Sequence, residues 1–448
     1  MALTGLQIYK LLPKTNCKEC GFPTCLAFAM KLAAKQVELA ACPYVSEEAK
    51  AALAAAAAPP IRLVTVGSGE KAVQVGNETV LFRHEKTFYH ESGLLVRLRD
   101  TQPLEEIEET AIQVDGYSVE RVGLELTLNG IAFENASGEV DAYVKGVEAI
   151  RAKTDLPLIL MAKDPKVMAA ALERADGANP LIYAATKDNW SDMAELARRH
   201  KCPLAVYEPD GLSALASLVE QVKGAGVEDI VLDPGTRGFS DSLIVLTQIR
   251  RLALKKNFRL LGYPIITFPG EGRGSVKQEA ILADQHIAKY AGLIVLDHFD
   301  PAAIYPLLTL RLNIYTDPQK PIQVAPGIYE ITGPDEKSPL LTTTNFSLTY
   351  FTVAGEVEAS GVPSWLLIVD TEGLSVLTAW AAGKFDAEKI AKSVQTSGIA
   401  DKIAHRKLVI PGFVATIMGD LEDELPGWEI LVGPREAIGL PAYLKAWG

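Results

Sequence analysis

Between residues 93 and 315, short apolar runs alternate with longer amphipathic segments, and this alternation constrains the fold more than any other feature of the chain. Short apolar runs are typical of buried parallel strands, which are connected by helices. Eight such strands with helices between them predict a closed TIM-type βα barrel, and a doubly wound open sheet is the alternative. The predicted strands are Leu94–Leu98, Arg121–Leu128, Leu158–Met161, Leu181–Ala184, Leu204–Tyr207, Ile230–Asp233, Pro264–Phe268 and Leu293–Leu296.

A second α/β pattern begins near residue 318. Its predicted strands are Leu340–Thr343, Leu366–Asp370, Leu408–Ile410 and Ile430–Val432, and each is followed by small or polar residues and then a predicted helix. Ligands of open α/β sheets bind at the carboxyl ends of the strands, so these turns predict one edge of a pocket. Their backbone N–H groups suit a ligand rich in amide oxygens or phosphate.

Four of the five cysteines lie near the amino terminus, spaced C-x2-C-x4-C-x16-C-P: Cys17, Cys20, Cys25 and Cys42. Four closely spaced thiolates predict a 4Fe–4S cluster. Structural zinc is the alternative, but it usually takes two C-x2-C pairs, and only one is present. A disulfide framework would suit a secreted domain, whereas residues 1–13 do not resemble a secretory leader. The remaining Cys202 is expected to be a small core residue.

The chain is expected to contain four parts: 1–58, a cluster domain; 59–92, a linker with β-hairpins; 93–317, the barrel; and 318–448, a C-terminal α/β domain. Three short helices are expected in the first part, the last over residues 47–58, before Pro59-Pro60 marks a boundary. Residues 67–72 match the dinucleotide pattern G-x-G-x-x-A, but strand-like alternation follows them, which favours a turn.

Charge and hydropathy exclude two classes of partner. The formal net charge is −12, which argues against nucleic-acid binding, because that function needs a basic face. No apolar run reaches the roughly 18 residues that a membrane span needs. We expect a soluble cytoplasmic protein whose partners are proteins or small molecules.

Residues 16–25 read N-C-K-E-C-G-F-P-T-C, which resembles the N-C-x-E-C-G-x-P-T-C signature of the large (gamma) subunit of the corrinoid iron–sulfur protein from the acetyl-CoA synthase/decarbonylase system. The resemblance continues through the whole chain, at Cys42-Pro43, Ala57–Pro60, Asn345–Tyr350, Asp370–Ala379 and Val432–Ala437. It implies an N-terminal 4Fe–4S domain, a central (βα)8 barrel and a C-terminal Rossmann-like domain that binds a cobalamin-type corrinoid.

The resemblance also implies a function: a methyl carrier in the anaerobic acetyl-CoA (Wood–Ljungdahl) pathway of carbon fixation. The cobalt would accept a methyl group from methyltetrahydrofolate through a separate methyltransferase and pass it to acetyl-CoA synthase/CO dehydrogenase. The cluster held by the four cysteines would reduce Co(II) to Co(I). A small subunit would complete a heterodimer, and a reductive activator would be a further partner. The chain would be a carrier subunit, of methyltransferase class if counted as an enzyme, with no catalytic residue of its own.

Two alternatives to the carrier stay open. The first is a self-contained pterin-dependent methyltransferase that uses its own barrel, and the second is an iron–sulfur electron-transfer protein. Residues 233–237 and 270–274 follow predicted barrel strands, and the barrel is similar to pterin-binding methyltransferase barrels. Strand ends of such barrels often carry catalytic groups, but we favour a turn-forming role for the glycines and the proline there.

The corrinoid contacts are expected in the C-terminal turns, whose hydroxyl and N–H groups could bind amide arms or the nucleotide phosphate. These residues are Thr343, Asn345, Thr349, Asp370, Thr371, Glu372, Gly373, Ser375, Val376, Leu377, Thr378, Pro411, Gly412, Gly433, Pro434, Arg435 and Glu436. The alternative for each is an ordinary capping role, as for Ser375 at a helix start.

No histidine motif for a lower cobalt ligand is present. The D-x-H-x-x-G pattern begins at Asp284-Gln285-His286, but Lys289 stands where glycine is required. We therefore expect a base-off corrinoid without a histidine ligand, since a weak axial donor makes Co(I) easier to reach. His405 is the one alternative, and its basic neighbours favour a solvated side chain.

Overall fold

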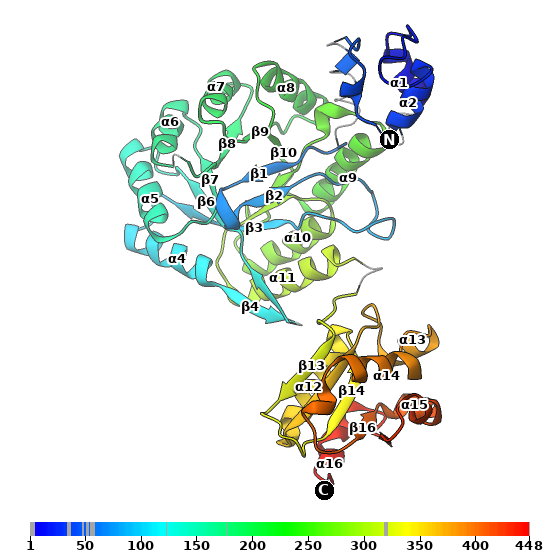
Figure 1. Ribbon diagram of the computed structural model, residues 1–448. Helices are drawn as coiled ribbons and strands as arrows, with labels where there is room; N and C mark the ends of the chain where they lie inside the picture. Colours follow the sequence, from blue (N-terminus) through cyan, green and yellow to red (C-terminus); the bar gives the residue numbers. More distant parts are fainter. Residues whose placement is uncertain are drawn as a thin grey trace. The chain divides into compact units, whose positions relative to one another are not determined.

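The computed structural model describes residues 5–33, 37–46, 49–50, 53, 59–121, 123–175, 177–317 and 321–447 (Figure 1). Contacts within the chain divide it into two units. The first comprises residues 1–117 and 127–315, and the second comprises residues 118–126 and 316–448. Within the described ranges, no helix is long and apolar enough to cross a membrane.

A small helical module opens the first unit. Its elements are α1 (Gly5–Leu11), α2 (Cys25–Ala33) and the 3-10 turn η1 (Leu39–Ala41). Ile8, Phe28 and Val45 form a small apolar core together with the buried Cys25 and Cys42. Two of the expected helices are therefore present, whereas most of the third, over residues 47–58, lies outside the described residues.

A short antiparallel hairpin closes the amino-terminal end of the barrel. It consists of β1 (Val64–Val66) and β2 (Val73–Val75), joined through η2 (Gly69–Lys71), so the G-x-G-x-x-A stretch is a turn, as predicted. The valines of both strands pack against inward residues of the barrel strands. The segment expected to be a linker thus contributes to the barrel core.

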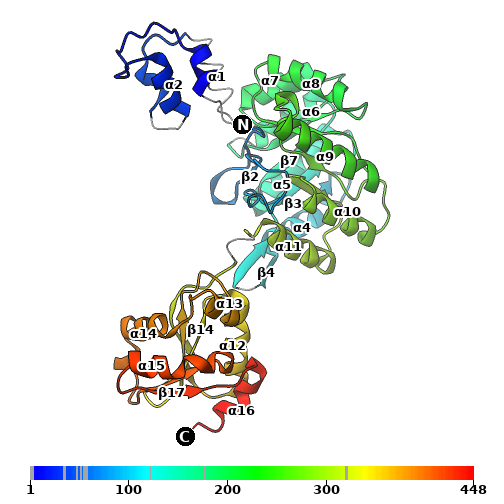
Figure 2. The same cartoon turned by 90° about the vertical axis from the view of Figure 1, so that its right-hand side faces the viewer.

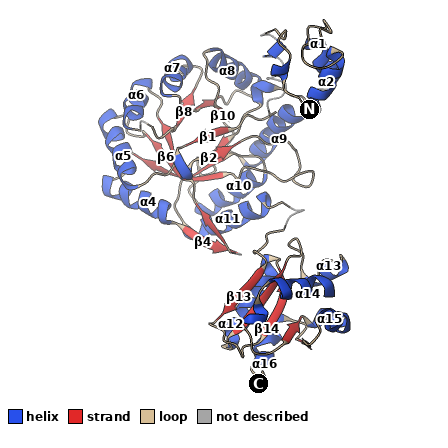
Figure 3. Ribbon diagram, viewed as in Figure 1, coloured by secondary structure: helices blue, strands red, loops and turns tan. Residues whose placement is uncertain are grey.

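The rest of the first unit is a closed barrel (Figure 3). Its strands are β3 (Gly93–Arg99), β6 (Gly130–Glu134), β7 (Leu158–Met161), β8 (Leu181–Ala185), β9 (Leu204–Tyr207), β10 (Ile230–Asp233), β11 (Ile266–Thr267) and β12 (Leu293–Leu296). Neighbouring strands are parallel, and the bridge between Leu232 and Ile265 joins the two ends of the sheet.

Helices alternate with these strands around the barrel. They are α4 (Leu104–Gly116), α5 (Val140–Lys153), α6 (Pro165–Arg174), α7 (Trp190–His200), α8 (Leu212–Gly224), α9 (Phe239–Lys255), α10 (Val276–Ala288) and α11 (Pro301–Tyr315), with η3 at Arg259–Leu261. The prediction of a (βα)8 barrel is confirmed. The open-sheet alternative is wrong, because the strand order closes on itself.

The predicted second barrel strand, Arg121–Leu128, is wrong. That place belongs to β6, while β4 (Ser118–Arg121) and β5 (Leu124–Thr127) form a separate two-stranded sheet that belongs to the second unit. The reason is the period of the pattern. Apolar and polar residues alternate over 122–128, as in a half-exposed strand, whereas a barrel strand needs a continuous buried run such as Ile131–Phe133.

The second unit is a Rossmann-like α/β domain, as predicted (Figure 2). Its sheet has the order β13-β15-β14-β16-β17, and only the edge strand β13 (Gly327–Ile331) is antiparallel. The parallel strands are β14 (Leu340–Thr344), β15 (Ser364–Val369), β16 (Lys407–Ile410) and β17 (Glu429–Val432). The chain runs from β14 outward to β15 and then returns to β16, so the strand order reverses between β14 and β16.

Helices pack on both faces of this sheet and form two apolar cores. One core contains α14 (Ala387–Thr396) and α15 (Met418–Glu424), and the other contains α12 (Ser347–Ser360) and α16 (Leu440–Leu444). The remaining elements are α13 (Val376–Ala381), η4 (Ile399–Asp401), η5 (Gly412–Ile417) and η6 (Ala437–Gly439).

Candidate functional site

A cavity of about 400 Å³ lies where the strand order of the second unit reverses. The carboxyl ends of β14 and β16 and the turn after β17 form its floor and one wall, and α12 and the start of α13 form the others. A crevice at such a switch point is the usual ligand site of open α/β sheets. The cavity is lined by Leu341, Thr342, Thr343, Leu348, Thr349, Thr352, Val353, Ser375, Val376, Leu377, Val409, Ile410, Pro411, Phe413, Gly433, Pro434, Arg435, Glu436, Ala437 and Leu440.

The structure brings most of the predicted contact residues to this cavity. Those that line it are Thr343, Thr349, Ser375, Val376, Leu377, Pro411, Gly433, Pro434, Arg435 and Glu436. Those that do not line it are Asn345, Asp370, Thr371, Glu372, Gly373, Thr378 and Gly412. The division separates residues that face the cavity from residues that shape the loops around it.

Asn345 shows how the predicted residues that do not line the cavity shape the loops around it. It is buried, and its Oδ1 accepts hydrogen bonds from Thr371 N at 2.9 Å and from Gly373 N at 3.0 Å. The Thr371 hydroxyl donates to the same oxygen. Asn345 Nδ2 in turn donates to Asp370 Oδ1. The polar groups of Asn345 and Thr371 therefore hold the loop after β15 against the end of β14.

Gly412 and Gly433 bring the loops after β16 and β17 into direct contact. Gly412 N donates to Pro434 O at 3.1 Å, and Gly433 N donates to Ile410 O at 2.9 Å. A Cβ atom on Gly412 would lie 2.5 Å from Gly433 O and 2.9 Å from Arg435 N. Only a residue without a side chain fits between these two backbones, so this wall of the cavity depends on glycine at position 412.

One buried hydroxyl at the cavity has no protein partner. The Thr343 residue is 1% exposed, and its Oγ1 makes no hydrogen bond, whereas Thr342 Oγ1 donates to Leu367 O at 3.1 Å. A buried polar group without a partner is costly, so an unpaired hydroxyl at a cavity wall indicates a ligand that would satisfy it.

Sequence reasoning identified Thr349 of α12 but missed the other residues that this helix supplies to the cavity wall. Leu348 and Thr352 line the cavity one helical turn apart, as do Thr349 and Val353. The spacing of four residues after a strand end could have identified this face. Phe413 and Leu440 were missed for another reason: they reach the cavity from η5 and the start of α16, which no local pattern predicts.

His405 has both ring nitrogens engaged. Its Nδ1 accepts from Lys407 N at 3.1 Å, so Nε2 carries the proton and donates to Ser338 O at 2.9 Å. The residue precedes the amino end of β16, whereas the cavity lies at the carboxyl end of that strand. The side chain is half-buried and packs beside Trp447 rather than being fully solvated as expected.

The four amino-terminal cysteines share the helical module but do not converge. Cys25 and Cys42 are buried, Cys20 is half-buried and Cys17 is exposed. Cys25 N donates to Asn16 Oδ1 at 2.9 Å, and the Tyr44 hydroxyl donates to Glu19 Oε1 at 2.8 Å. Within the described part of the chain, no three Cys, His, Asp or Glu side chains lie close enough together to hold a metal ion.

The loop that carries Cys17 and Cys20 is tightly coiled. Asn16, Lys18 and Gly21 all have positive φ angles, of 48°, 67° and 81°. Gly21 N also donates to Lys18 O at 2.9 Å, which closes a turn. Turns that point successive backbone N–H groups to one side are found at many iron–sulfur sites. Ligand sets of this kind often assemble only as the metal binds.

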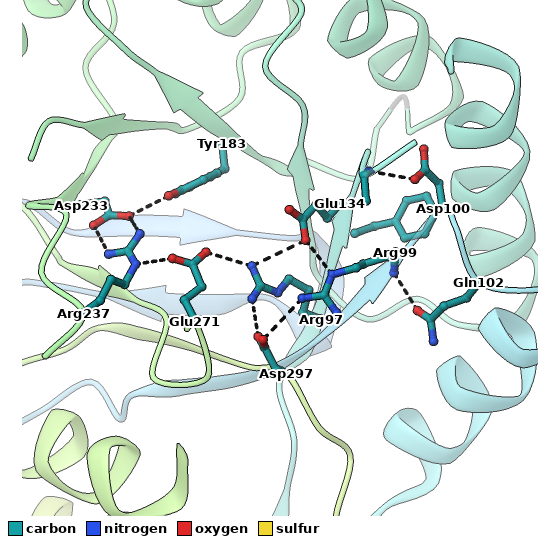
Figure 4. Close-up of polar contacts among 12 residues, drawn as sticks. Arg97, Arg99, Asp100, Gln102, Glu134, Tyr183, Asp233, Arg237, Glu271 and Asp297 are labelled. Atoms are coloured by element: carbon teal, nitrogen blue, oxygen red, sulfur yellow. Dashed lines mark hydrogen bonds and ion pairs between the residues drawn. The ribbon is translucent and has the colours of Figure 1, made fainter. Parts of the chain in front are cut away.

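Charged side chains at the barrel's carboxyl-terminal mouth pair with one another (Figure 4). Arg97 is buried and contacts Asp297 at 2.5 Å and Glu271 at 2.9 Å. Arg237 holds Asp233 through two hydrogen bonds of 3.0 and 2.9 Å and also contacts Glu271. Burial alone would lower the pKa of Arg237, but the Asp233 carboxylate outweighs burial and raises it.

The barrel loops at residues 233–237 and 270–274 meet in this network, through Arg237 and Glu271. Asp233 Oδ1 accepts from Gly235 N at 2.8 Å, and Gly235 and Gly272 have φ angles of 71° and 72°. A cavity of about 630 Å³ opens beside the network, with Lys163, Tyr207 and Glu208 among its lining residues. Because the loops' charges bind each other, the geometry favours turn formation and structural pairing for the two loops.

The buried His286 predicts a pH dependence of stability. The residue is 0% exposed, and neither ring nitrogen makes a hydrogen bond. Burial, with smaller contributions from Arg237 and Arg273, lowers the pKa of His286 to about 3. An unfolded histidine titrates near 6.5, so stability that is present above pH ~6.5 is lost as the pH falls toward 3, at ~1.4 kcal/mol per unit.

We expect wild-type protein to lose ~2 kcal/mol more stability between pH ~7.5 and ~5 than His286→Met does, measured as the free energy of urea unfolding. His84→Gln, at an exposed position, is the control and should follow the wild type. Equal pH dependence of His286→Met and the wild type would contradict the assignment.

Comparison with known proteins places the chain in a family. Residues 63–444 match the model described as CO dehydrogenase/acetyl-CoA synthase delta subunit, and residues 12–44 match one described as a putative Fe-S cluster. The corrinoid/iron-sulfur protein large subunit of Moorella thermoacetica is 48% identical over 100% of this chain and 99% of its own length. The chain belongs to this family of large subunits.

Archaeal members are more distant but also match over nearly their whole length. The acetyl-CoA decarbonylase/synthase complex subunit gamma of Methanothermobacter thermautotrophicus is 39% identical, over 99% of both chains. The Fe-S family match, residues 12–44, spans all four clustered cysteines. The family resemblance inferred from the N-C-x-E-C-G-x-P-T-C signature is therefore confirmed.

Solved structures with a similar fold are dihydropteroate synthases. The enzyme of Thermus thermophilus has a TM-score of 0.41 and 21% identity, covering 56% of this chain and 100% of that one. The enzyme of Vibrio fischeri has a TM-score of 0.37 and 16% identity, covering 50% and 93%. Neither similarity bears on the function of the large subunit.

Proposed function

We propose that this chain is a methyl carrier of the acetyl-CoA pathway, with a corrinoid in its C-terminal domain and an iron–sulfur cluster in its N-terminal module. The observation that carries the proposal is the full-length identity of 48% to a protein named corrinoid/iron-sulfur protein large subunit. When bound, the corrinoid supplies a cobalt that accepts a methyl group from methyltetrahydrofolate, through a separate methyltransferase, and donates it to acetyl-CoA synthase.

The residues of the C-terminal cavity fit the nucleotide end of such a cofactor. A volume of about 400 Å³ suits a ligand fragment, and the walls are mainly apolar. The unpartnered Thr343 hydroxyl and the Arg435 side chain offer a hydrogen bond and a positive charge for the phosphate. Of the expected contacts, we propose that the cavity-lining residues touch the corrinoid, while Asn345, Asp370–Gly373, Thr378 and Gly412 position the loops.

We propose a base-off corrinoid without a histidine ligand. A nucleotide base enclosed in the cavity would be held by protein rather than by cobalt. His405, the alternative ligand, uses both nitrogens elsewhere and precedes the opposite end of β16. The electron paramagnetic resonance spectrum of the Co(II) protein should therefore lack nitrogen superhyperfine splitting, and its presence would refute the proposal.

Cys17, Cys20, Cys25 and Cys42 are proposed to hold a 4Fe–4S cluster that returns Co(II) to Co(I). The donor chemistry fits, because four thiols lie within one small module. Cys17 and Cys20 lie on the coiled loop, Cys25 begins α2, and Cys42 follows η1. The proposed partners are a small subunit, the methyltransferase, acetyl-CoA synthase/CO dehydrogenase and a reductive activator. We propose a cytoplasmic location, and the four-part division at residues 58, 92 and 317 likewise stays a prediction.

Metal and corrinoid analysis of anaerobically purified protein tests the proposal. Iron, sulfide and cobalt should be present together, and the visible spectrum should show corrin bands beside the iron–sulfur absorption. Iron–sulfur absorption alone would favour an electron-transfer protein. Binding of methyltetrahydrofolate to the isolated chain, measured by calorimetry, would favour a self-contained methyltransferase.

Thr343→Val should have opposite effects on the stability of the corrinoid-free protein and on its affinity for the corrinoid. Removing an unpaired buried hydroxyl should stabilise the corrinoid-free protein by ~1 kcal/mol, and losing a ligand hydrogen bond should weaken corrinoid binding about five- to tenfold. Thr342→Val is the matched control, because its hydroxyl is already paired, so that variant should lose stability. Thermal unfolding and a corrinoid titration give both quantities, and unchanged affinity of Thr343→Val would contradict the proposed contact.

A further inference from the structure

The cavity of about 630 Å³ at the barrel's carboxyl-terminal mouth has no role in the proposed function. Its lining comes from the ends of β6 to β9 and from the loops after β10 and β11, and it includes Glu134, Tyr183, Arg237 and Glu271, which Figure 4 labels. Loops at the carboxyl ends of the strands form the ligand sites of βα barrels, and a volume of this size is typical of small-molecule sites. We call this space the mouth cavity.

The mouth cavity contains a buried carboxylate that the protein itself compensates only in part. Glu208 directly follows β9, lines the cavity and is 5% exposed. Its Oε1 accepts one hydrogen bond, from Asp210 N at 2.9 Å. Its Oε2 has no hydrogen bond, and no basic side chain in the described part of the chain forms an ion pair with Glu208. Burying a carboxylate without a cation is costly, so the free oxygen indicates a positively charged ligand group.

Other carboxylates at this end of the barrel are compensated by the protein. Glu271 forms ion pairs with Arg97 and Arg237. Asp100 is 9% exposed and, within the described ranges, also lacks an ion pair, but its two oxygens accept four hydrogen bonds from the loop after β6. Glu208 has neither kind of compensation. The single hydrogen bond from Asp210 shapes the turn after β9 and uses one oxygen only.

The rest of the lining suits a small organic cation. The lining residues include five carboxylates and three basic side chains, a net charge of −2. Met161 and Ala184 are buried apolar residues of the same lining, at the ends of β7 and β8. Tyr207, at the end of β9, is half-buried and adds an aromatic ring, whose π face attracts positive charge. The cavity thus combines negative charge with apolar surface for a carbon chain.

We propose that the mouth cavity binds a small organic cation whose guanidinium or ammonium group pairs with Glu208. Its carbon chain lies against the apolar lining at Met161 and Ala184. A charge-assisted hydrogen bond to Oε2 would satisfy the oxygen that the protein leaves free. The proposal is independent of the corrinoid and the iron–sulfur cluster, because it concerns the barrel alone.

Butylguanidinium and butylurea are the probes, because they have nearly the same shape and differ in charge. Ligand-observed NMR titration of the full-length protein, purified with its cofactors, gives the dissociation constant of each. We expect butylguanidinium to bind with a Kd of about 1 mM or below at low salt, which is reasonable for so small a ligand. Butylurea should bind at least about tenfold more weakly, because it cannot neutralise Glu208.

Glu208→Gln keeps the shape of the side chain and removes its charge. It should weaken butylguanidinium binding at least about tenfold and leave butylurea binding within about twofold of the wild type. Without ligand, it should raise the melting temperature by about 1–3 °C, because an uncompensated buried charge is gone. Glu195→Gln, at an exposed position of α7, is the matched control and should change neither quantity.

Three results would overturn the proposal. The first is the absence of butylguanidinium binding to the wild type, and the second is equal affinity of the wild type for both probes. Neither depends on whether a variant folds. The third is a Glu208→Gln variant that keeps the wild-type affinity for butylguanidinium, which would assign the carboxylate to the turn after β9 alone. Iron and cobalt contents test the proposed function separately, and none of these three results would alter them.

Discussion

Replacing Cys25 with serine is expected to remove most of the iron and sulfide from the protein. Cys25 is 5% exposed at the first position of α2, and its N–H is held by Asn16 Oδ1. A hydroxyl is a poor substitute for a thiolate at iron, and the rigid placement of this residue leaves little room for a substitute ligand to take its position. We expect iron per protein to fall by at least about half, together with the iron–sulfur absorption.

Cys202→Ser provides the control, because Cys202 is also a buried cysteine but lies in the barrel. Its iron content should match the wild type, with a stability loss of ~1 kcal/mol. Loss of iron in Cys202→Ser, or its full retention in Cys25→Ser, would contradict the assignment of the four-cysteine set. Zinc in place of iron would favour a structural zinc site, the alternative to the 4Fe–4S cluster.

Gly412→Ala should damage the C-terminal cavity. The added Cβ would lie 2.5 Å from Gly433 O, and a backbone oxygen cannot swing aside as a side chain can. The loops after β16 and β17 must separate, which should cost ~1–3 kcal/mol of stability. Because these loops form one wall of the cavity, we also expect corrinoid affinity to fall at least about tenfold.

Gly419→Ala is the matched control, since a Cβ there meets nothing within 4 Å and the residue lies inside α15. Alanine should stabilise that helix by ~0.5–1 kcal/mol and leave corrinoid retention unchanged. Denaturant unfolding and the cobalt content after dialysis measure both effects. Normal cobalt retention by Gly412→Ala would show that this wall is not part of the binding site.

The fold was predictable wherever burial sets the residue pattern. Continuous apolar runs identified most barrel strands, and Leu158–Met161 was predicted at the residues where β7 lies. The failure at Arg121–Leu128 came from an alternating pattern that belongs to a different unit. The edge strand β13 was not predicted at all, because its residues are mostly half-buried and carry no continuous apolar run.

The candidate site was predictable where strand ends provide it. The turns after β16 and β17 were identified because Pro411, Gly433 and Pro434 follow apolar runs directly. The distinction between Thr343, which faces the cavity, and Asn345, which holds a loop, requires the three-dimensional contacts. A sequence gives the position of a polar residue, but it does not show which neighbouring groups form hydrogen bonds with that residue.

The strands β4 and β5 have a consequence for dissecting this molecule. Because residues 118–126 belong with 316–448, the backbone passes between the two units three times rather than once. A fragment beginning at residue 316 would leave behind two strands of its own unit, and excision of the barrel would cut an internal segment as well as an end. The C-terminal domain is therefore not a continuous segment of the chain. Transferring it to another protein would require residues 118–126 as well, which are encoded about two hundred residues earlier.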